Sequence, residues 1–291
     1  MGKADHARRK AAELRAAQQR RTQVRRRLFV AGGSVALVIV LAVVAVLVGR
    51  SSRPSPAATT AKVSAPISIP EVAAELGNVP PATFDSVGTG SATGLKAISG
   101  NPLLTSGGKP EILYVGGEFC PWCAAERWAL AVALSRFGTF SGLLFIHSSP
   151  TDGDIPTLSF YKSAYSSKYV SFDPVEWYGE ADDANTPFGH VYLQQPTAAE
   201  AALFAKYSGD SLPFVDIGNR YLLPETQYNP GDLSGLTWQQ IATDMRNPSS
   251  PVARDIDGAA NYLTATICKL TNGQPGGVCT SAGVKAAAGS L

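Results

Sequence analysis

Residues 109–137 read KPEILYVGGEFCPWCAAERWALAVALSRF, and this stretch decides how the domain folds. Its apolar run, 111–115, has the length and composition of a buried strand. Two glycines then turn the chain, and apolar residues recur at helical spacing after the second cysteine. Pro121 suits the first helical position, where its fixed φ fits and its missing N–H is no loss. The stretch therefore predicts a strand, a turn and a helix, with Cys120 at the helix N-terminus.

Cys120 and Cys123 have the C-x-x-C spacing of a redox dithiol. At a helix N-terminus, the unpaired N–H groups and the positive end of the dipole stabilise a thiolate, which lowers the thiol pKa. Cys123, one turn further on, is placed to attack a mixed disulfide formed at Cys120. We therefore predict that Cys120 is the nucleophile and Cys123 the resolving thiol. A static disulfide and half of a metal site are the alternative interpretations.

The first fifty residues combine a basic segment with a long apolar run. Residues 1–27 hold ten Lys or Arg against two acids, and residues 28–48 carry no charge. A helix of that length is roughly 32 Å long, which matches the roughly 30 Å hydrocarbon core of a bilayer. A signal peptide has only roughly 7–15 apolar residues. We therefore predict a cytoplasmic tail (1–27) and an uncleaved transmembrane helix (28–48), with the main domain outside the cytoplasm by the positive-inside rule.

Beyond this span, the charge balance reverses. Residues 51–291 hold fourteen Lys or Arg against twenty-one acids, so the overall net charge of +2 averages two opposite parts of the chain. Residues 49–69 are rich in Ser, Pro, Ala and Thr and predict a flexible linker. We predict an extracytoplasmic domain over 70–283 and a short tail over 284–291.

The chain has four cysteines, all beyond the predicted span. An even number in an extracytoplasmic domain favours two disulfides, and the spacing favours Cys120–Cys123 with Cys268–Cys279 among three connectivities. The second pair closes a short loop containing three glycines and a proline, which favours a structural disulfide. A shuttle that exchanges with the first pair is the alternative.

The rest of the domain predicts an α/β fold. Residues 143–147 predict a second strand parallel to the first, and residues 214–217 and 221–223 predict a hairpin around Gly218-Asn219. Thr237 and Gln240 have the spacing of a capping box for a helix over 238–245. A longer helix is expected from Ser250-Pro251 towards Cys268.

With C-P-W-C after a strand, and Leu212-Pro213 before a late hairpin and a closing helix, the sequence resembles the thioredoxin superfamily. The stretch 109–137, Phe160-Tyr161 and the C-terminal cysteine pair are more closely similar to a membrane-anchored domain-of-unknown-function family, number 929. The resemblance covers roughly residues 70–280 and implies a thioredoxin-like fold with an insertion between Cys123 and Pro213. It also implies that Pro213 is cis and lines the substrate groove.

Two further features qualify the resemblance. In thioredoxins a buried acid stands six residues before the first cysteine, but Tyr114 occupies that position here, so the usual proton relay is in doubt. Glu118 and Glu126 are nearer in sequence, and we expect both to be solvated charges.

We expect Trp122 and Pro121 to line the groove beside Pro213, with Trp122 modulating the exposure of the cysteines. His147 and His190 are expected to be ordinary loop or surface histidines.

The other chemistries that use paired cysteines fit less well. The spacing of the two pairs matches no common zinc ribbon, and haem attachment needs a His where Ala124 stands. A copper carrier often adds methionine ligands, but the chain has only Met1 and Met245. We expect no cofactor and no metal. The basic N-terminus lacks interleaved aromatics and is better explained by topology and anionic lipid than by nucleic acid.

The sequence thus predicts a membrane-anchored thiol–disulfide oxidoreductase whose partners are protein substrates, membrane lipid and a membrane redox partner. The motif does not specify whether the enzyme acts as an oxidase, a reductase or an isomerase, because related folds span roughly −270 to −120 mV. The alternatives are a non-catalytic thioredoxin-like binding module with structural disulfides and, less favoured, a copper or other metal carrier.

Overall fold

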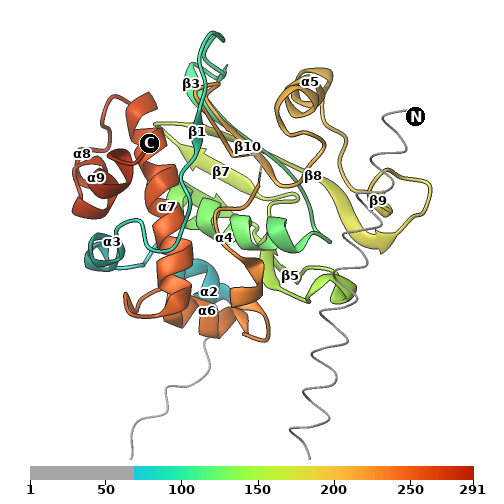
Figure 1. The fold of residues 1–291 in the computed structure, drawn as a ribbon, viewed down its shortest axis with the longest axis horizontal. Coiled ribbons are helices and arrows are strands. Elements are labelled where there is room, and N and C mark those ends of the chain that lie inside the picture. Colours follow the sequence, from blue (N-terminus) through green and yellow to red (C-terminus); the bar gives the residue numbers. More distant parts are fainter. Residues whose placement is uncertain (1–68, 224) are drawn as a thin grey trace, which may run out of the picture. The chain divides into compact units, whose positions relative to one another are not determined.

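The computed structural model describes residues 69–223 and 225–291, which belong to one unit of the chain, Ala65–Leu291 (Figure 1). Its helices are α2 (Ile69–Glu75), α3 (Pro81–Val87), α4 (Pro121–Ser135), α5 (Ala198–Tyr207), α6 (Trp238–Asp244), α7 (Pro251–Leu270), α8 (Gly276–Cys279) and α9 (Ala282–Ala288). Its strands are β1 (Lys96–Ala97), β2 (Thr105–Ser106), β3 (Lys109–Gly117), β4 (Gly138–Ser141), β5 (Leu144–His147), β6 (Pro156–Ser159), β7 (Ala164–Ser167), β8 (Ser171–Asp182), β9 (His190–Tyr192), β10 (Phe214–Ile217) and β11 (Tyr221–Leu223).

A mixed sheet forms the centre of the described unit. Seven strands of the described residues take part, in the order β1-β11-β10-β3-β8-β9, and β2 pairs with β3 outside that path. Strands β3 and β8 are parallel, with Val115 opposite Val175, whereas β10 is antiparallel to β3, with Phe214 opposite Val115. The predicted α/β class and the β10–β11 hairpin are therefore confirmed.

Alternate side chains of β3 face opposite sides of this sheet, as the two-residue period of a strand requires. Ile112 and Tyr114 join the larger apolar core with α4 and α7, whereas Leu113 and Val115 join a smaller core with Phe204 of α5. Figure 1 shows α5 on one side of the sheet and α4 and α7 on the other. The strand that leads to the cysteines is thus buried on both faces.

One predicted strand pairing was wrong. Residues 144–147 do form a strand, β5, but it pairs antiparallel with β6 in a separate two-stranded sheet, and β4 pairs with β7 in another. The parallel neighbour of β3 is β8, which starts far later in the sequence. The segment 138–167 is therefore an excursion between α4 and β8. It packs on α4, where Trp128 Nε1 donates to the Pro156 carbonyl at 2.9 Å.

The two predicted C-terminal helices are confirmed in detail. Thr237 and Gln240 form a reciprocal capping box at the start of α6, and the Ser250 hydroxyl caps the first turn of α7. The helix α7 packs on α4 and also contacts α3 and α9. The predicted tail over 284–291 was wrong, because α9 occupies it and buries Val284 and Ala287. A small helix with an apolar face is enough to extend the core.

The predicted cytoplasmic tail (1–27) and transmembrane helix (28–48) lie outside the described residues, as does nearly all of the predicted linker (49–69). Within residues 69–223 and 225–291, no helix is long and apolar enough to cross a bilayer.

Candidate functional site

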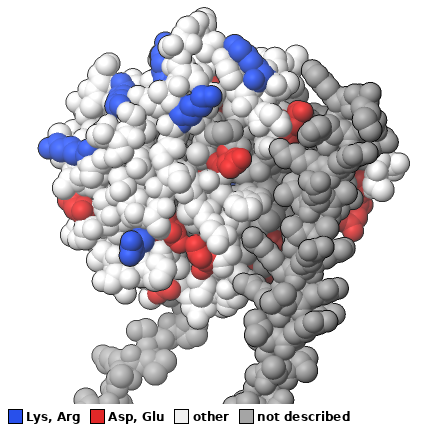
Figure 2. Space-filling model, viewed as in Figure 1, with Lys and Arg blue, Asp and Glu red and all other residues white. Residues whose placement is uncertain are grey.

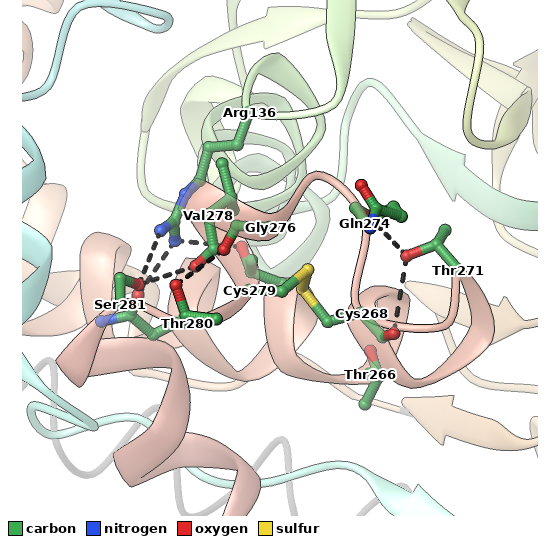
Figure 3. Close-up of a disulfide and its surroundings, with 12 residues drawn as sticks. Arg136, Thr266, Cys268, Thr271, Gln274, Gly276, Val278, Cys279, Thr280 and Ser281 are labelled. Atoms are coloured by element: carbon green, nitrogen blue, oxygen red, sulfur yellow. Dashed lines mark hydrogen bonds between the residues drawn. A yellow bond between two sulfur atoms is a disulfide. The ribbon is translucent and has the colours of Figure 1, made fainter.

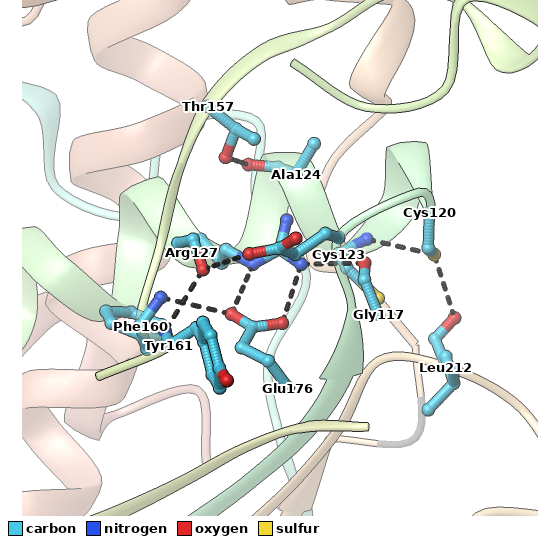
Figure 4. Close-up of polar contacts among 12 residues, drawn as sticks. Gly117, Cys120, Cys123, Ala124, Arg127, Thr157, Phe160, Tyr161, Glu176 and Leu212 are labelled. Carbon is cyan, nitrogen blue, oxygen red and sulfur yellow. Dashed lines mark hydrogen bonds and ion pairs between the residues drawn. The ribbon is translucent and has the colours of Figure 1, made fainter. Parts of the chain in front are cut away.

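The chain places Cys120 at the junction of the central strand and the first long helix. Strand β3 ends at Gly117, where the Gly117 carbonyl accepts the backbone N–H of Cys120 at 3.1 Å. Cys120 is the N-cap residue of α4, with φ −77° and ψ 122°, and Pro121 follows at the first helical position. The predicted strand, turn and helix are therefore present, and Cys120 lies at the helix N-terminus (Figure 4).

The predicted Cys120–Cys123 disulfide is not formed in this structure, where both cysteines of the motif are free thiols. The Cys120 sulfur accepts the backbone N–H of Cys123 at 3.3 Å, in the manner of a capping side chain (Figure 4). Burial by itself raises the pKa of Cys120, but hydrogen bonds from Cys123, the positive charge of Arg127 and the N–H of Trp122 outweigh burial and lower that pKa below its ordinary value. The thiolate of Cys120 is thus favoured by its surroundings.

Cys123 is in the opposite electrostatic situation. Its side chain is completely buried, and burial together with the neighbouring Cys120 sulfur raises its pKa well above the ordinary value. One sulfur of the pair is therefore set to ionise and the other to remain protonated. This asymmetry matches the predicted division between a nucleophile and a resolving thiol.

A loop from the last third of the chain lies against Cys120. Because β10 runs antiparallel to β3 with Phe214 opposite Val115, the residues just before β10 lie near the end of β3. The Leu212–Pro213 peptide bond is cis, as the resemblance implied, and the Cys120 sulfur lies 3.8 Å from the Leu212 carbonyl oxygen (Figure 4). Pro213 is thus beside the dithiol, although about ninety residues separate the two in sequence.

The immediate rim of the dithiol is aromatic. Trp122 is 49% exposed, the largest exposed fraction of any aromatic side chain among those described, whereas Cys120 is only 5% exposed. Phe119 stacks on His190, with ring centroids 3.8 Å apart. His190 was predicted to be an ordinary loop or surface residue, but it begins β9 and is buried. His147 is partly exposed, and its Nδ1 lies 3.0 Å from the Oδ1 of Asp154, which accepts the hydrogen bond.

A buried ion pair lies one helical turn below Cys123, and the sequence did not point to it. Arg127 of α4 donates from Nε and Nη2 to the two carboxylate oxygens of Glu176 in β8, both at 2.8 Å, and both side chains are fully buried. Arg127 Nη2 also donates to the Gly117 carbonyl at 2.6 Å. The only signal in the sequence was a pair of adjacent charged residues, Glu126 and Arg127, in a helix whose other residues are mainly apolar.

Glu118 and Glu126 were predicted to be solvated, and this was wrong. Glu126 is completely buried because α4 is covered on nearly every side, and burial raises its pKa to about 8. It accepts from Thr226 and the backbone of Gln227, both at 3.3 Å. Glu118 is partly buried and accepts from Ser159 at 2.6 Å, and burial also raises its pKa.

The other two cysteines form a disulfide, Cys268–Cys279, which joins α7 to α8 (Figure 3). Their Cα atoms are 5.6 Å apart, and the loop is tied further by Thr271, whose hydroxyl donates to the Gln274 carbonyl at 2.6 Å. The predicted pairing of these cysteines is confirmed.

We expect replacement of both disulfide cysteines, Cys268→Ala with Cys279→Ala, to lower the free energy of unfolding by about 3 kcal/mol. The disulfide closes a loop with a sequence separation of 11, and opening it returns that conformational entropy to the unfolded chain. Urea denaturation of both proteins measures the difference. Unchanged stability would show that the disulfide does not stabilise the fold.

Comparison with known proteins places the dithiol region in a family. A model of the domain of unknown function DUF929 matches residues 97–269, which is more than half of the chain. This range holds both cysteines of the motif, Arg127, Glu176 and Pro213, and it ends just after Cys268. No match was found among curated proteins or among solved structures. The chain therefore belongs to the DUF929 family, as its central motif and C-terminal cysteines indicated.

Proposed function

We propose that this protein is a membrane-anchored, extracytoplasmic thiol–disulfide oxidoreductase that acts on proteins through Cys120 and Cys123. The observation that carries the proposal is the asymmetry of the pair at the N-terminus of α4. Cys120 accepts the N–H of Cys123 and has a lowered pKa, whereas the Cys123 thiol is buried with a raised pKa. A purely structural pair has no need of such an asymmetry.

We further propose that the domain has a thioredoxin-like fold with an inserted excursion. The order β3, α4, parallel β8, then the antiparallel hairpin β10–β11 and the closing helix α7, supports this assignment. The position of the Leu212-Pro213 loop beside the dithiol, with the Leu212 carbonyl oxygen 3.8 Å from the Cys120 sulfur, supports it independently. In this proposal, β4 to β7 form the insertion, and Pro213, Pro121 and Trp122 line the groove for substrate.

The proposed reaction is a thiol–disulfide exchange in two steps. The Cys120 thiolate attacks one sulfur of a substrate disulfide, that S–S bond breaks, and one substrate sulfur leaves as a thiolate that takes up a proton. Cys123 then loses its proton and attacks the Cys120 sulfur, which releases the second substrate thiol. The protein ends with a Cys120–Cys123 disulfide, and the substrate has gained two electrons and two protons. Running the steps in reverse oxidises a substrate dithiol.

The partners proposed are protein substrates, bilayer lipid around the anchor and a membrane redox partner that resets the dithiol. The charge pattern of residues 1–48 supports the anchor and an N-terminus in the cytoplasm. On the face seen in Figure 2, the charged groups of the described residues are interspersed among uncharged ones, without a broad basic stripe. Together with the acidic balance of residues 51–291, this favours protein over nucleic acid as the partner.

A glutathione redox titration tests the proposal. The purified protein is equilibrated over a series of glutathione ratios, and free thiols are trapped by alkylation and located by mass spectrometry. We expect Cys120 and Cys123 to change together from alkylated to protected within the roughly −270 to −120 mV range of related dithiols. A pair that stays fixed in one state throughout the series would contradict the proposal.

The second candidate is a non-catalytic binding module, which the low exposure of Cys120, 5%, favours. It predicts no change of the dithiol in the same titration. A metal carrier is less well supported, because no group of three or more His, Cys, Asp or Glu side chains converges within the described residues. It predicts one bound Cu(I) or Zn(II) per reduced protein, which metal analysis after gel filtration would detect.

A further inference from the structure

We propose that the buried Arg127–Glu176 pair positions the dithiol and stabilises the thiolate form of Cys120. In this arrangement Arg127 anchors the turn that carries Cys120 and supplies a fixed positive charge to the Cys120 thiolate, while Glu176 holds the guanidinium in place and moderates its field. This inference rests on the proposed function, because it assigns positioning residues to the same site.

Arg127 contacts the turn between β3 and Cys120 directly. The Gly117 carbonyl accepts both Arg127 Nη2, at 2.6 Å, and the backbone N–H of Cys120, at 3.1 Å. The guanidinium and the nucleophilic cysteine therefore share one acceptor at the end of β3. Figure 4 shows the continuous set of contacts from Phe160 through Glu176 and Arg127 to Gly117.

Hydrogen bonds fix the orientation of the Arg127–Glu176 pair. Glu176 Oε1, which accepts from Arg127 Nε, also accepts from the backbone N–H of Phe160 at 3.2 Å, and the backbone N–H of Glu176 donates to the side chain of Gln194 at 2.7 Å. The guanidinium is fixed by two parallel bonds to the carboxylate, which is the most directional geometry that an arginine makes. The positive end of the pair is thereby directed at Gly117 and the negative end at Phe160.

Burial strengthens the electrostatic effect of Arg127 on the cysteines. Both side chains are completely shielded from water, so the field of Arg127 is screened far less than that of a surface charge. Burial by itself opposes this charge, but Glu176 raises the Arg127 pKa well above its ordinary value and keeps the guanidinium charged. Arg127 lowers the pKa of both cysteines, acting against burial, which is the largest influence on each.

Stability alone does not explain why an ion pair is buried here. Replacing such a pair by apolar residues is often neutral or stabilising, so stability alone is a weak explanation. Within the described residues, Arg127 Nη1 has no hydrogen-bond partner, and neither has the hydroxyl of Tyr114 beside it. The guanidinium is thus kept buried although one of its nitrogens is unsatisfied, which fits a charge retained for the dithiol.

Other titratable groups near the dithiol come from four segments, one of which is β9, whose His190 stacks on Phe119 beside Cys120. Tyr114 of β3 remains a neutral phenol, because burial raises its pKa well above the ordinary value. Glu118 in the turn is partly buried and bonded to Ser159, and Glu126 of α4 is bonded to Thr226 and Gln227. Only Arg127 presents a permanent positive charge to the dithiol, among the residues the structure describes.

The test compares the pH dependence of Cys120 alkylation in the reduced full-length protein in detergent. Three variants are needed: Glu176→Gln, the double variant Arg127→Met with Glu176→Gln, and Arg127→Lys. The first removes the negative charge and one of the two acceptor oxygens of Glu176. The second removes the pair without leaving a buried carboxylate, and the third keeps the positive charge without the bidentate geometry. Mass spectrometry assigns the alkylated residue, and circular dichroism confirms that each variant is folded.

The two principal variants should move the alkylation midpoint in opposite directions. Glu176→Gln exposes the thiolate to an unbalanced positive charge and should lower the midpoint pH of Cys120. The double variant should raise it by on the order of one pH unit, which is tenfold in thiolate fraction below the midpoint and about 30 mV in reduction potential towards a more reducing dithiol. Arg127→Lys should recover most of the midpoint.

Arg136→Met is the matched control. Arg136 directly follows the same helix, is also largely removed from solvent and lies over the Phe84 ring at 4.2 Å, but it contacts Asn261 and Thr264 instead of the dithiol turn. Losing a buried arginine of this kind should change stability and leave the midpoint of Cys120 unmoved. A purely structural role for Arg127 predicts the same result for the double variant.

The inference is overturned if Glu176→Gln and the double variant leave the midpoint unchanged or shift it in the same direction. If the double variant does not fold, the direction of the Glu176→Gln shift decides alone, because that variant keeps Arg127 and its contact with the Gly117 carbonyl. The alkylation assay needs no substrate. A protein that shows opposite shifts but no exchange with glutathione would therefore refute the proposed function and leave this inference standing.

Discussion

Cys123→Ser is expected to accumulate mixed disulfides between Cys120 and its protein substrates, whereas Cys120→Ser is expected to form none. Cys120 has the lowered pKa and is slightly exposed, whereas Cys123 is fully buried, so Cys120 is expected to react first. The buried Cys123 thiol is then required to release the substrate, and a hydroxyl cannot replace it in that step. Non-reducing electrophoresis of cells, trapped with acid and alkylating agent, measures the accumulation.

The expected loss of turnover is at least 10³-fold for either variant, because each removes one of the two sulfurs that the exchange requires. The double variant Cys120→Ser with Cys123→Ser is the control for background disulfides. Replacement of the distant pair, Cys268→Ala with Cys279→Ala, should leave trapping by Cys123→Ser intact. Adducts that persist in Cys120→Ser would contradict the assignment of the nucleophile, and absence of adducts in every variant would favour the non-catalytic module.

The stability of the domain is expected to fall as pH rises from about 5 to 8, because of two buried carboxyl groups. Burial raises the pKa of Glu126 from 4.5 to about 8 and that of Asp257 from 3.8 to about 8, and both side chains are fully buried. In the unfolded chain both groups ionise near their ordinary values. Within this window the folded state therefore binds more protons than the unfolded state, and stability decreases with pH.

The slope is about 1.4 kcal/mol per pH unit for each group that stays protonated only in the folded state. Glu126→Gln and Asp257→Asn keep the side-chain shape and cannot ionise, so each should remove one such contribution. Urea denaturation at several pH values within the window measures the slopes, and groups common to all three proteins cancel in the comparison. Identical slopes in wild type and both variants would show that these carboxyls ionise normally in the folded protein.

Features specified by neighbouring residues could be predicted from the sequence. The turn of β10–β11, the capping box of Thr237 and Gln240, and the start of α7 after Ser250 each depend on residues within a few positions of one another. The position of Cys120 at a helix N-terminus is of the same kind, because Pro121 and the apolar periodicity that follows are local signals. Such features can be predicted because the residues that determine them are close together in the sequence.

Features that depend on distant partners could not be predicted in this way. Residues 144–147 have the composition of a buried strand, but nothing in them distinguishes pairing with β6 from pairing with β3. Glu126 was expected to be solvated because carboxylates usually are. Its burial follows from the covering of α4 by several elements, and Glu176 becomes the partner of Arg127 only when β8 aligns beside β3.

The cis-proline loop illustrates how a resemblance adds information that periodicity lacks. Leu212-Pro213 could be an ordinary turn on local grounds, and the motif order suggested instead that it lies beside the cysteines. The contact between the Cys120 sulfur and the Leu212 carbonyl oxygen, at 3.8 Å, places it there. Its role as a substrate groove stays a prediction.

The contacts that surround Cys120 also set the moment at which its chemistry can begin. Gly117 lies three residues away, but Glu176 and Leu212 join the chain of contacts from 56 and 92 positions further on. Contacts of such sequence separation form only after the intervening chain has been organised. A newly made chain therefore passes through a stage in which Cys120 is an ordinary cysteine, and it acquires its distinct reactivity only with the completed sheet. In the proposed function, completion of the fold and activation of Cys120 are therefore one event.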